Sequence, residues 1–330
     1  MITFIIRRLI NSVILVLLVS LIVFILIRMV PGDPISVLIN AEQERAMEGG
    51  TPLTAEELQA LRDRIIAEFG FDRPLPVQFI SWLGDMLTGN FGTSILDGFD
   101  TATELARRIP VSMYLGLIAF VVTNIFGIFW GVISAVRNGS IVDNIVSGVS
   151  ILGMTVPGFL MAVLLMYILS FQLELLPLHG FSLPWRGTDV ALSMRQTVMP
   201  VMVMSIGGIA GMQRQCRSSM LEVINADYVR TAWAKGMREK VVIFKHVLKN
   251  GLMPIVSMQG GMLGGIIGGS VIVETIFNVP GVGGMVVNAM QRLDYPVIQA
   301  VVVMFTFITV MSNLVVDLLY GWVDPRIRHS

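Results

Sequence analysis

The sequence predicts an all-α polytopic membrane protein with six transmembrane helices and both termini in the cytoplasm. Of its 330 residues, 54% are hydrophobic and only 14% are charged, whereas soluble domains carry about 25% charged residues. The apolar residues gather in six segments of 18 to 29 residues, and ~20 helical residues cross a hydrocarbon core of about 30 Å. A third observation, the placement of the basic residues, sets the orientation.

The six expected spans contain no charged residue apart from Arg28 in the first: Leu9–Val30, Val111–Val136, Ile145–Leu173, Gln196–Gln213, Gly251–Val273 and Val297–Val316. The chain then divides into an N-terminal tail with the first span (1–30), an extracytoplasmic segment (31–110) and a membrane core with the other five spans (111–330). A cleaved signal peptide is the alternative for the first span, but its apolar run exceeds the usual h-region. Pro157 and Pro200 predict kinks in the third and fourth spans.

Basic residues favour a cytoplasmic N-terminus. With that orientation the short cytoplasmic segments hold thirteen of them: Arg7 and Arg8, Arg137, eight from Arg214 to Lys249, and Arg326 and Arg328. The outer segment from 31 to 110 has six basic and thirteen acidic residues, but its length exempts it from the rule. The balance of 23 basic and 23 acidic residues gives no indication of a nucleic-acid partner.

The outer segment contains helix signals. Thr54 and Glu57 match a capping box, and apolar residues follow at helical spacing until Gly70 (Leu58, Leu61, Ile65 and Phe69). A second helix is expected after Pro76, with apolar residues at Ile80, Leu83 and Leu87. We expect these helices to pack as a small acidic cap, and a solvated loop is the alternative.

The cytoplasmic loop between the fourth and fifth spans, residues 214–252, contains a candidate short helix from Asp227 to Gly236. Asp227 is a suitable N-cap, Gly236 a suitable C′ residue, and Lys235 complements the helix dipole. The spacing predicts Tyr228, Ala232 and Trp233 on one side, as a knob for a groove in another protein. A basic loop that only enforces topology is the alternative.

Several segments together resemble the permease subunits of ATP-binding-cassette importers in the dipeptide, oligopeptide and nickel branch. The resemblance covers nearly the whole chain, and its order and spacing make it specific. It rests on these segments: Arg7-Arg8, Pro31-Gly32-Asp33-Pro34, Gly92-Thr93-Ser94, Arg137-Asn138-Gly139-Ser140, Met220 to Val223, Asp227 to Gly236, His246 to Pro254, Glu274 to Gly283, Asp294-Tyr295-Pro296 and Asp324 to Arg328.

The resemblance implies that the short cytoplasmic helix docks on a cytoplasmic ATPase subunit. The implied coupling residues are Asp227, Tyr228, Arg230, Thr231, Ala232, Trp233, Lys235 and Gly236. In the wider family this loop reads E-A-A-x-x-x-G. Here Arg230 replaces the glutamate, as in the peptide branch, and Trp233 stands where the family usually has arginine.

The resemblance also implies partners and a location. The partners are a second similar permease, two ATPase subunits that bind ATP and Mg, and an extracytoplasmic substrate-binding protein, in contact with membrane lipids. The location is a bacterial or archaeal plasma (inner) membrane. The implied function is alternating-access import of peptides, or of a similar solute such as a nickel complex.

The sequence argues more strongly against an enzyme than against a carrier. The chain has no G-x-x-x-x-G-K-[S/T] phosphate loop, so we expect neither ATP hydrolysis nor a cofactor in this chain. Its three histidines and single cysteine (His179, His246, His329 and Cys216) form no metal-ligand motif, and no catalytic or metal-binding residue is nominated. An ion-gradient-driven secondary transporter or channel remains the alternative. Three carboxylates near helix ends would be capping groups or a proton relay: Glu174, Glu274 and Asp317.

The fifth span contains a run of small residues. Its glycines give overlapping small-xxx-small pairs (Gly260, Gly261, Gly264, Gly265, Gly268 and Gly269), which allow close helix approach in a membrane. We expect close packing at Gly261, Gly264, Gly265 and Gly268 before a gating role. The 22 methionines suggest adaptable substrate-lining side chains, or ordinary core and lipid-facing residues.

Overall fold

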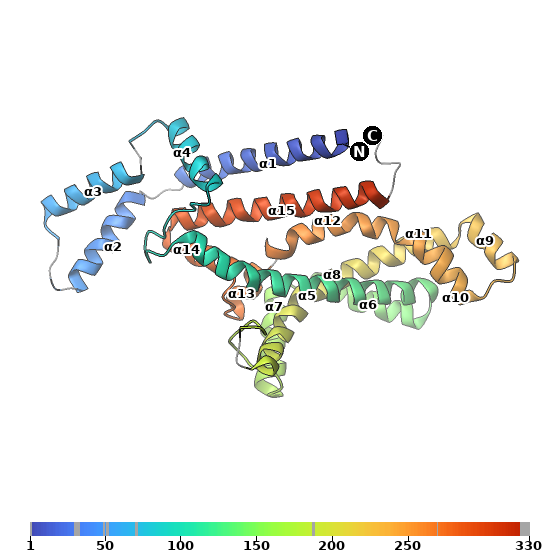
Figure 1. Ribbon diagram of the computed structural model, residues 1–330. Coiled ribbons are helices and arrows are strands. Elements are labelled where there is room, and N and C mark those ends of the chain that lie inside the picture. Colours follow the sequence, from blue (N-terminus) through green and yellow to red (C-terminus); the bar gives the residue numbers. More distant parts are fainter. Residues whose placement is uncertain are drawn as a thin grey trace. The chain divides into compact units, whose positions relative to one another are not determined.

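The computed structural model describes residues 2–29, 34–48, 50, 53–69, 72–186, 189–268 and 270–323 (Figure 1). The regular secondary structure in these ranges is helical. The β pairing found there is an isolated bridge between Thr93 and Asp100. The helices are α1 Ile2–Met29, α2 Pro34–Glu48, α3 Ala55–Phe69, α4 Leu75–Leu87, α5 Thr101–Val136, α6 Ile141–Thr155, α7 Gly158–Leu165, η1 Met166–Gln172, α8 Val190–Ile224, α9 Asp227–Ala234, α10 Glu239–Val241, η2 Val242–Leu248, α11 Lys249–Gly251, α12 Met253–Gly268, α13 Val271–Ile276, α14 Val282–Arg292 and α15 Tyr295–Val323.

Four uninterrupted helices are long and apolar enough to cross a membrane, and two bent helix pairs raise the number to six if each pair is one span. The uninterrupted segments are Ile5–Met29, Thr101–Val136, Val190–Ile224 and Tyr295–Val316. They correspond to the expected first, second, fourth and sixth spans. The expected third and fifth spans overlap the two bent pairs, each of which is either a broken span or a re-entrant loop.

The third span breaks at Pro157, where the sequence predicts a kink. Val156 and Pro157 have extended backbone, with ψ of 122° and 136°, because the proline ring disfavours helical geometry at the residue before it. The axes of α6 and of the helix formed by α7 and η1 differ by 104°. Pro200 behaves differently, since it lies inside the uninterrupted helix α8.

Two spans are longer than their apolar segments indicate. Helix α5 begins ten residues before Val111 and continues through Pro110, so the helix starts inside the segment expected to be extracytoplasmic. The side chain of Asp100 accepts hydrogen bonds from the backbone N–H of Thr103, at 2.8 Å, and from its hydroxyl, which satisfies an orphan donor of the first turn. Helix α8 continues eleven residues beyond Gln213, to Ile224.

The outer segment has three helices where the sequence predicts two. Helix α2 was missed because Pro34–Glu48 has no clear apolar periodicity; it packs against α3. The predicted capping box of α3 is confirmed: the Thr54 backbone N–H donates to Glu57 Oε2 at 2.8 Å, and the Glu57 N–H donates to Thr54 Oγ1 at 3.4 Å. The bonds from Thr54 hold the pKa of Glu57 below its usual value.

Contacts divide the chain into two compact units, which are described separately. One comprises residues 1–5, 110–284 and 311–330, and the other comprises residues 6–109 and 285–310. In the first unit, a buried apolar cluster joins α5, α7, α8 and α13 around Leu115, Ala162, Met199 and Phe277. A second cluster, described with the candidate site, lies between α5, α8, α9, η2 and α12.

Close packing through glycine occurs between α5 and α8. A Cβ atom added at Gly131 would lie 2.5 Å from Cys216 Cβ, and one added at Gly127 would lie 2.5 Å from Met212 Cβ. Gly127 and Gly131 form a G-x-x-x-G pair on one face of α5, which lets the backbones approach where lipid gives no hydrophobic drive. The sequence predicted close packing at the glycines of the fifth span and did not indicate the contact between α5 and α8.

Replacement of Gly131 by alanine is expected to destabilise the chain by about 1–3 kcal/mol, because the new methyl group meets the Cys216 side chain and the Gln213 carbonyl at 2.9 Å or less. Denaturant titration of the purified protein in detergent measures the change in unfolding free energy. Gly148→Ala in α6 is the matched control, since nothing lies within 4 Å of its added Cβ. Equal stability of the two variants would contradict the close α5–α8 contact.

Three glycines of the fifth span face open space, and a fourth is buried. A Cβ added at Gly261, Gly265 or Gly268 meets nothing within 4 Å, whereas Gly264 is buried. Their expected role in packing or gating therefore stays a prediction, and within this chain alone three of the four make no close contact.

Some expectations fall outside the described residues. These are the segment Pro31-Gly32-Asp33, the helix stop at Gly70, Gly269 and the tail from Asp324 to Arg328. Helix α15 includes Asp317, but its side chain is not among those that the structure describes.

Candidate coupling site

Helix α9 forms at the predicted place, and its C-terminal cap explains where it ends. Gly236 has a φ of +72°, a conformation that glycine adopts without steric cost. The Gly236 N–H donates to Trp233 O at 2.9 Å and the Met237 N–H donates to Ala232 O at 3.3 Å. These two bonds define a Schellman motif, which confirms Gly236 as the C′ residue.

The predicted N-cap of α9 is wrong by one residue. Ala226 occupies the N-cap position without a side-chain bond, and Asp227 is the first helical residue. The Asp227 side chain is fully exposed and lies 3.8 Å from Arg230. Its negative charge still complements the positive end of the helix dipole, so it supports the first turn without capping it.

One face of α9 is buried in its own chain. Val229 is fully buried and Ala232 is 5% exposed, and both join a cluster with Met220 of α8 and Val242 and Val247 of η2. The expectation that Ala232 shares an outward face with Tyr228 is therefore wrong. A three- to four-residue spacing places Val229 and Ala232 together on the inner side.

The rest of α9 is exposed and carries two aromatic rings, one on each side of the buried strip. Tyr228 is 45% and Trp233 is 42% exposed, while the Arg230 side chain is 72% exposed. Thr231 and Lys235 are also exposed. Aromatic and arginine side chains are enriched in protein interfaces, so these exposed side chains have the composition of a docking surface.

Helix α9 is tied to the start of the fifth span. The Asn250 side chain of α11 donates hydrogen bonds to the Tyr228 hydroxyl at 2.9 Å and to the His246 carbonyl at 3.0 Å. Together with the buried cluster, this connects the exposed face of α9 to η2 and α11, which lead directly into α12 (Figure 1). Side-chain contacts therefore join α9 to the helices that precede α12.

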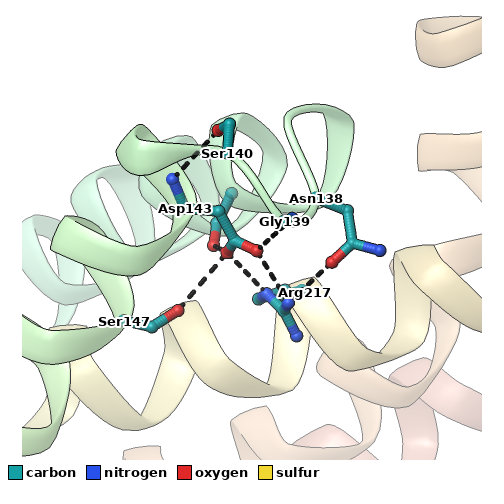
Figure 2. A network of polar contacts seen from close by, with 7 residues as sticks. Asn138, Gly139, Ser140, Asp143, Ser147 and Arg217 are labelled. Atoms are coloured by element: carbon teal, nitrogen blue, oxygen red, sulfur yellow. Dashed lines mark hydrogen bonds and ion pairs between the residues drawn. The ribbon is translucent and has the colours of Figure 1, made fainter.

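An ion pair between a buried aspartate and a partly exposed arginine joins α6 to α8 (Figure 2). Asp143 of α6 is 2% exposed, and Arg217 of α8 donates to both of its carboxylate oxygens, at 2.8 Å each. Asp143 also accepts bonds from the Ser134 hydroxyl and from the Gly139 N–H, the latter at 2.9 Å. Arg217 donates further to Asn138 Oδ1 at 2.8 Å. The loop at 137–140 is thereby fixed to α8.

A second buried carboxyl group organises the segment after the fifth span. Glu274 is 1% exposed, and its Oε1 accepts hydrogen bonds from the Ser112 and Ser270 hydroxyls, each at 2.6 Å. Its Oε2 accepts from the Gly284 N–H in the first turn of α14, at 3.0 Å. This pattern supports a capping role over a proton relay. Glu174, by contrast, is exposed in a left-handed conformation with φ of +50°.

Two distant sequence motifs meet in the other unit. Ser94 of the Gly92-Thr93-Ser94 motif donates its hydroxyl proton to Asp294 Oδ2 at 2.5 Å, and the Ile95 N–H donates to Asp294 Oδ1 at 3.2 Å. Arg292 forms a bidentate pair with Asp97 at 2.7 and 3.0 Å. Nothing in the spacing of the sequence indicates this pairing.

The middle of the second span carries a polar pair. Gln259 of α12 donates from its side-chain amide to Asn124 Oδ1 of α5 at 2.8 Å. Both are neutral amides, so the pair needs no proton or metal for its hydrogen bond. The residues that the structure describes hold no cluster of three or more potential metal ligands.

These features are those of an integral-membrane protein that carries a short helix, α9, with exposed aromatic side chains. Comparison with known families is specific: residues 127–329 match the binding-protein-dependent transport system inner membrane component, and residues 1–96 match the N-terminal domain of such membrane components. The chain belongs to this family, the permeases of ATP-binding-cassette peptide importers, and is a multi-pass protein of the plasma membrane.

Relatives match over the full length. The chain is 35% identical to an oligopeptide transport system permease of Bacillus subtilis, with 100% of both chains covered. It is 35% identical to a dipeptide transport system permease of Lactococcus lactis, over 99% of this chain and 100% of the relative. A glutathione transport system permease of Pectobacterium atrosepticum is 34% identical over 100% of both chains.

Proposed function

We propose that this chain is one membrane-spanning half of an ATP-driven importer for peptides. It pairs with a second similar permease and with two ATPase subunits that bind ATP and Mg, and an extracytoplasmic binding protein delivers the substrate. ATP binding closes the ATPase pair, α9 moves, and the spans switch from inward-facing to outward-facing. The observation that carries this proposal is α9, a short helix with exposed aromatic side chains whose buried face packs against η2 and the start of the fifth span.

Peptides are the proposed substrate class because the matched relatives are named oligopeptide, dipeptide and glutathione permeases. Oligopeptides, dipeptides and glutathione all contain amide bonds. Neutral amides such as Gln259 and Asn124, within hydrogen-bond distance of each other in the membrane core, suit a path for solutes that carry amide groups. A nickel complex or another solute is the alternative within the same importer class.

Trp233→Asp tests the docking role of α9. Trp233 is 42% exposed and outside the buried cluster, so a charged side chain there leaves the core intact but disrupts an apolar interface. We expect at least a tenfold loss of ATPase subunits that co-purify with the permease, and a similar loss of uptake. Val241→Asp is the matched control, because Val241 lies in α10 and is 40% exposed. Normal association of the Trp233 variant would remove α9 as the docking element.

The acidic outer segment is proposed to contact the binding protein. It has a net charge of −7, from six basic and thirteen acidic residues in 31–110, and α2 and α3 pack together in it. Deletion of residues 54–70 is expected to abolish stimulation of ATP hydrolysis by the substrate-loaded binding protein, while the permease still inserts and binds the ATPase subunits. Unchanged stimulation would exclude this contact.

A further inference from the structure

Helix α4, outside the expected spans, packs against α1 through aromatic side chains. The Phe79 and Trp82 rings lie 5.3 and 5.6 Å from the Phe24 ring. The guanidinium of Arg28 lies 3.4 Å from the centre of the Phe24 ring, and its Nη2 donates to Gln78 Oε1 at 2.8 Å. These contacts fix one side of α4 on the C-terminal part of α1.

The remaining surface of α4 divides into an apolar and a polar strip. Ile80 and Leu87, seven residues apart and therefore on one side of the helix, are 69% and 81% exposed. Ser81 and Asp85 are also exposed. At 100° per residue, Ser81 lies about a quarter of a turn around the helix from Ile80, and Asp85 lies about two-fifths of a turn from it on the same side. The sequence predicted a helix with apolar residues at Ile80 and Leu87 that would pack in a small cap. The packed residues are instead Phe79, Trp82 and the buried Met86.

The contact with Phe24 sets the depth of α4. The candidate span of α1 is Ile5–Met29, so Phe24 lies five residues before its end, or about 7.5 Å along the helix. The neighbouring surface of α1 is apolar and exposed: Ile22 45%, Ile25 45%, Leu26 56% and Met29 72%. A helix held at this depth beside such a surface lies at the boundary between lipid headgroups and acyl chains.

We propose that α4 is an interfacial helix whose Ile80–Leu87 strip inserts into the lipid leaflet at the C-terminal end of α1. In the expected topology this is the outer leaflet. The polar strip with Ser81 and Asp85 then faces water, which matches the division of an amphipathic helix in a membrane plane. Trp82 and Arg28 have the side chains that anchor at the membrane interface.

This assignment gives α4 a role in the transporter. The helix precedes the Ser94–Asp294 contact and the start of α5 in the chain. Lipid insertion of α4 therefore fixes the outer segment to the membrane beside the first span. A lipid occupant is favoured over a protein because α4 packs on the C-terminal part of α1, whose own side chains there are apolar and exposed.

Site-specific labelling of the assembled transporter in lipid nanodiscs tests the proposal. An environment-sensitive fluorophore is attached to Ile80→Cys or Leu87→Cys, with Ser81→Cys and Asp85→Cys as controls on the same helix, all in a Cys216→Ala background. We expect blue-shifted emission at 80 and 87, at least twofold quenching by lipids with a nitroxide at a shallow acyl position, and little quenching by iodide. Positions 81 and 85 should show the reverse pattern.

Two quenching results would overturn the proposal. Quenching of positions 80 and 87 by iodide as strong as at 85 would place the strip in water. Protection from both quenchers would place a protein subunit over it. The unsubstituted protein provides an independent readout: a photoactivatable phospholipid should label residues 75–87, and labelling of α1 without labelling of α4 would likewise refute lipid insertion.

Discussion

Arg217→Ala is expected to lower the free energy of unfolding by about 3–5 kcal/mol, because it leaves the Asp143 carboxylate buried without its cation. Asp143 is 2% exposed, and Arg217 satisfies both of its oxygens at 2.8 Å. Denaturant titration in detergent measures the change. Arg230→Ala is the control, since its exposed pair with Asp227 at 3.8 Å should contribute little.

A double variant separates lost charge balance from lost packing. Asp143→Asn combined with Arg217→Met removes both charges and keeps similar side-chain volumes. It should be less destabilising than Arg217→Ala alone, because no uncompensated charge remains. If Arg217→Ala cost less than about 1 kcal/mol, the pair would be no more important than an exposed salt bridge, and α6 would be held to α8 by apolar contacts.

Glu274→Ala is expected to destabilise the chain by several kcal/mol. It removes the acceptor for the Ser112 and Ser270 hydroxyls and for the Gly284 N–H, and each buried donor left without a partner costs about 1–3 kcal/mol. The surroundings are also shaped for this carboxyl group, since a Cβ added at Gly281 would lie 2.3 Å from Glu274 Cδ. Unfolding in detergent measures the loss.

Glu274→Gln separates the structural role from proton transfer. The amide oxygen keeps an acceptor for the two serines, but its NH₂ group faces the Gly284 N–H, a second donor. We expect a smaller loss of stability than with alanine, and ATP-driven uptake in proportion to the folded fraction. Folded protein with uptake abolished would contradict the capping role and favour a proton relay.

The sequence predicted what depends on local pattern. Apolar segment length predicted membrane spans, the Thr54–Glu57 pair predicted the start of α3, and Gly236 predicted the end of α9. Pro157 predicted the break in the third span, because proline acts on its own backbone and that of its neighbour.

The features that the sequence did not predict depend on contacts between residues far apart in the chain or on different helices. Ala232 turned inward because Val229 and the η2 side chains form a core beneath α9. The pairs Asp143–Arg217 and Ser94–Asp294 are separated by 74 and 200 residues, and no local periodicity relates such positions. Close glycine packing occurred between α5 and α8, at Gly131, because the partner side chain and not the glycine run selects the contact.

Photo-crosslinking from α9 tests the central claim of a coupling helix most directly. A photoreactive amino acid replaces Trp233 in the intact transporter, and mass spectrometry identifies the adducts after illumination in native membranes. We predict a crosslink to an ATPase subunit with a phosphate-binding loop, and none from the same probe at Glu56 in α3. Adducts at position 233 with lipid alone, while the ATPase subunits are present in the complex, would contradict the account.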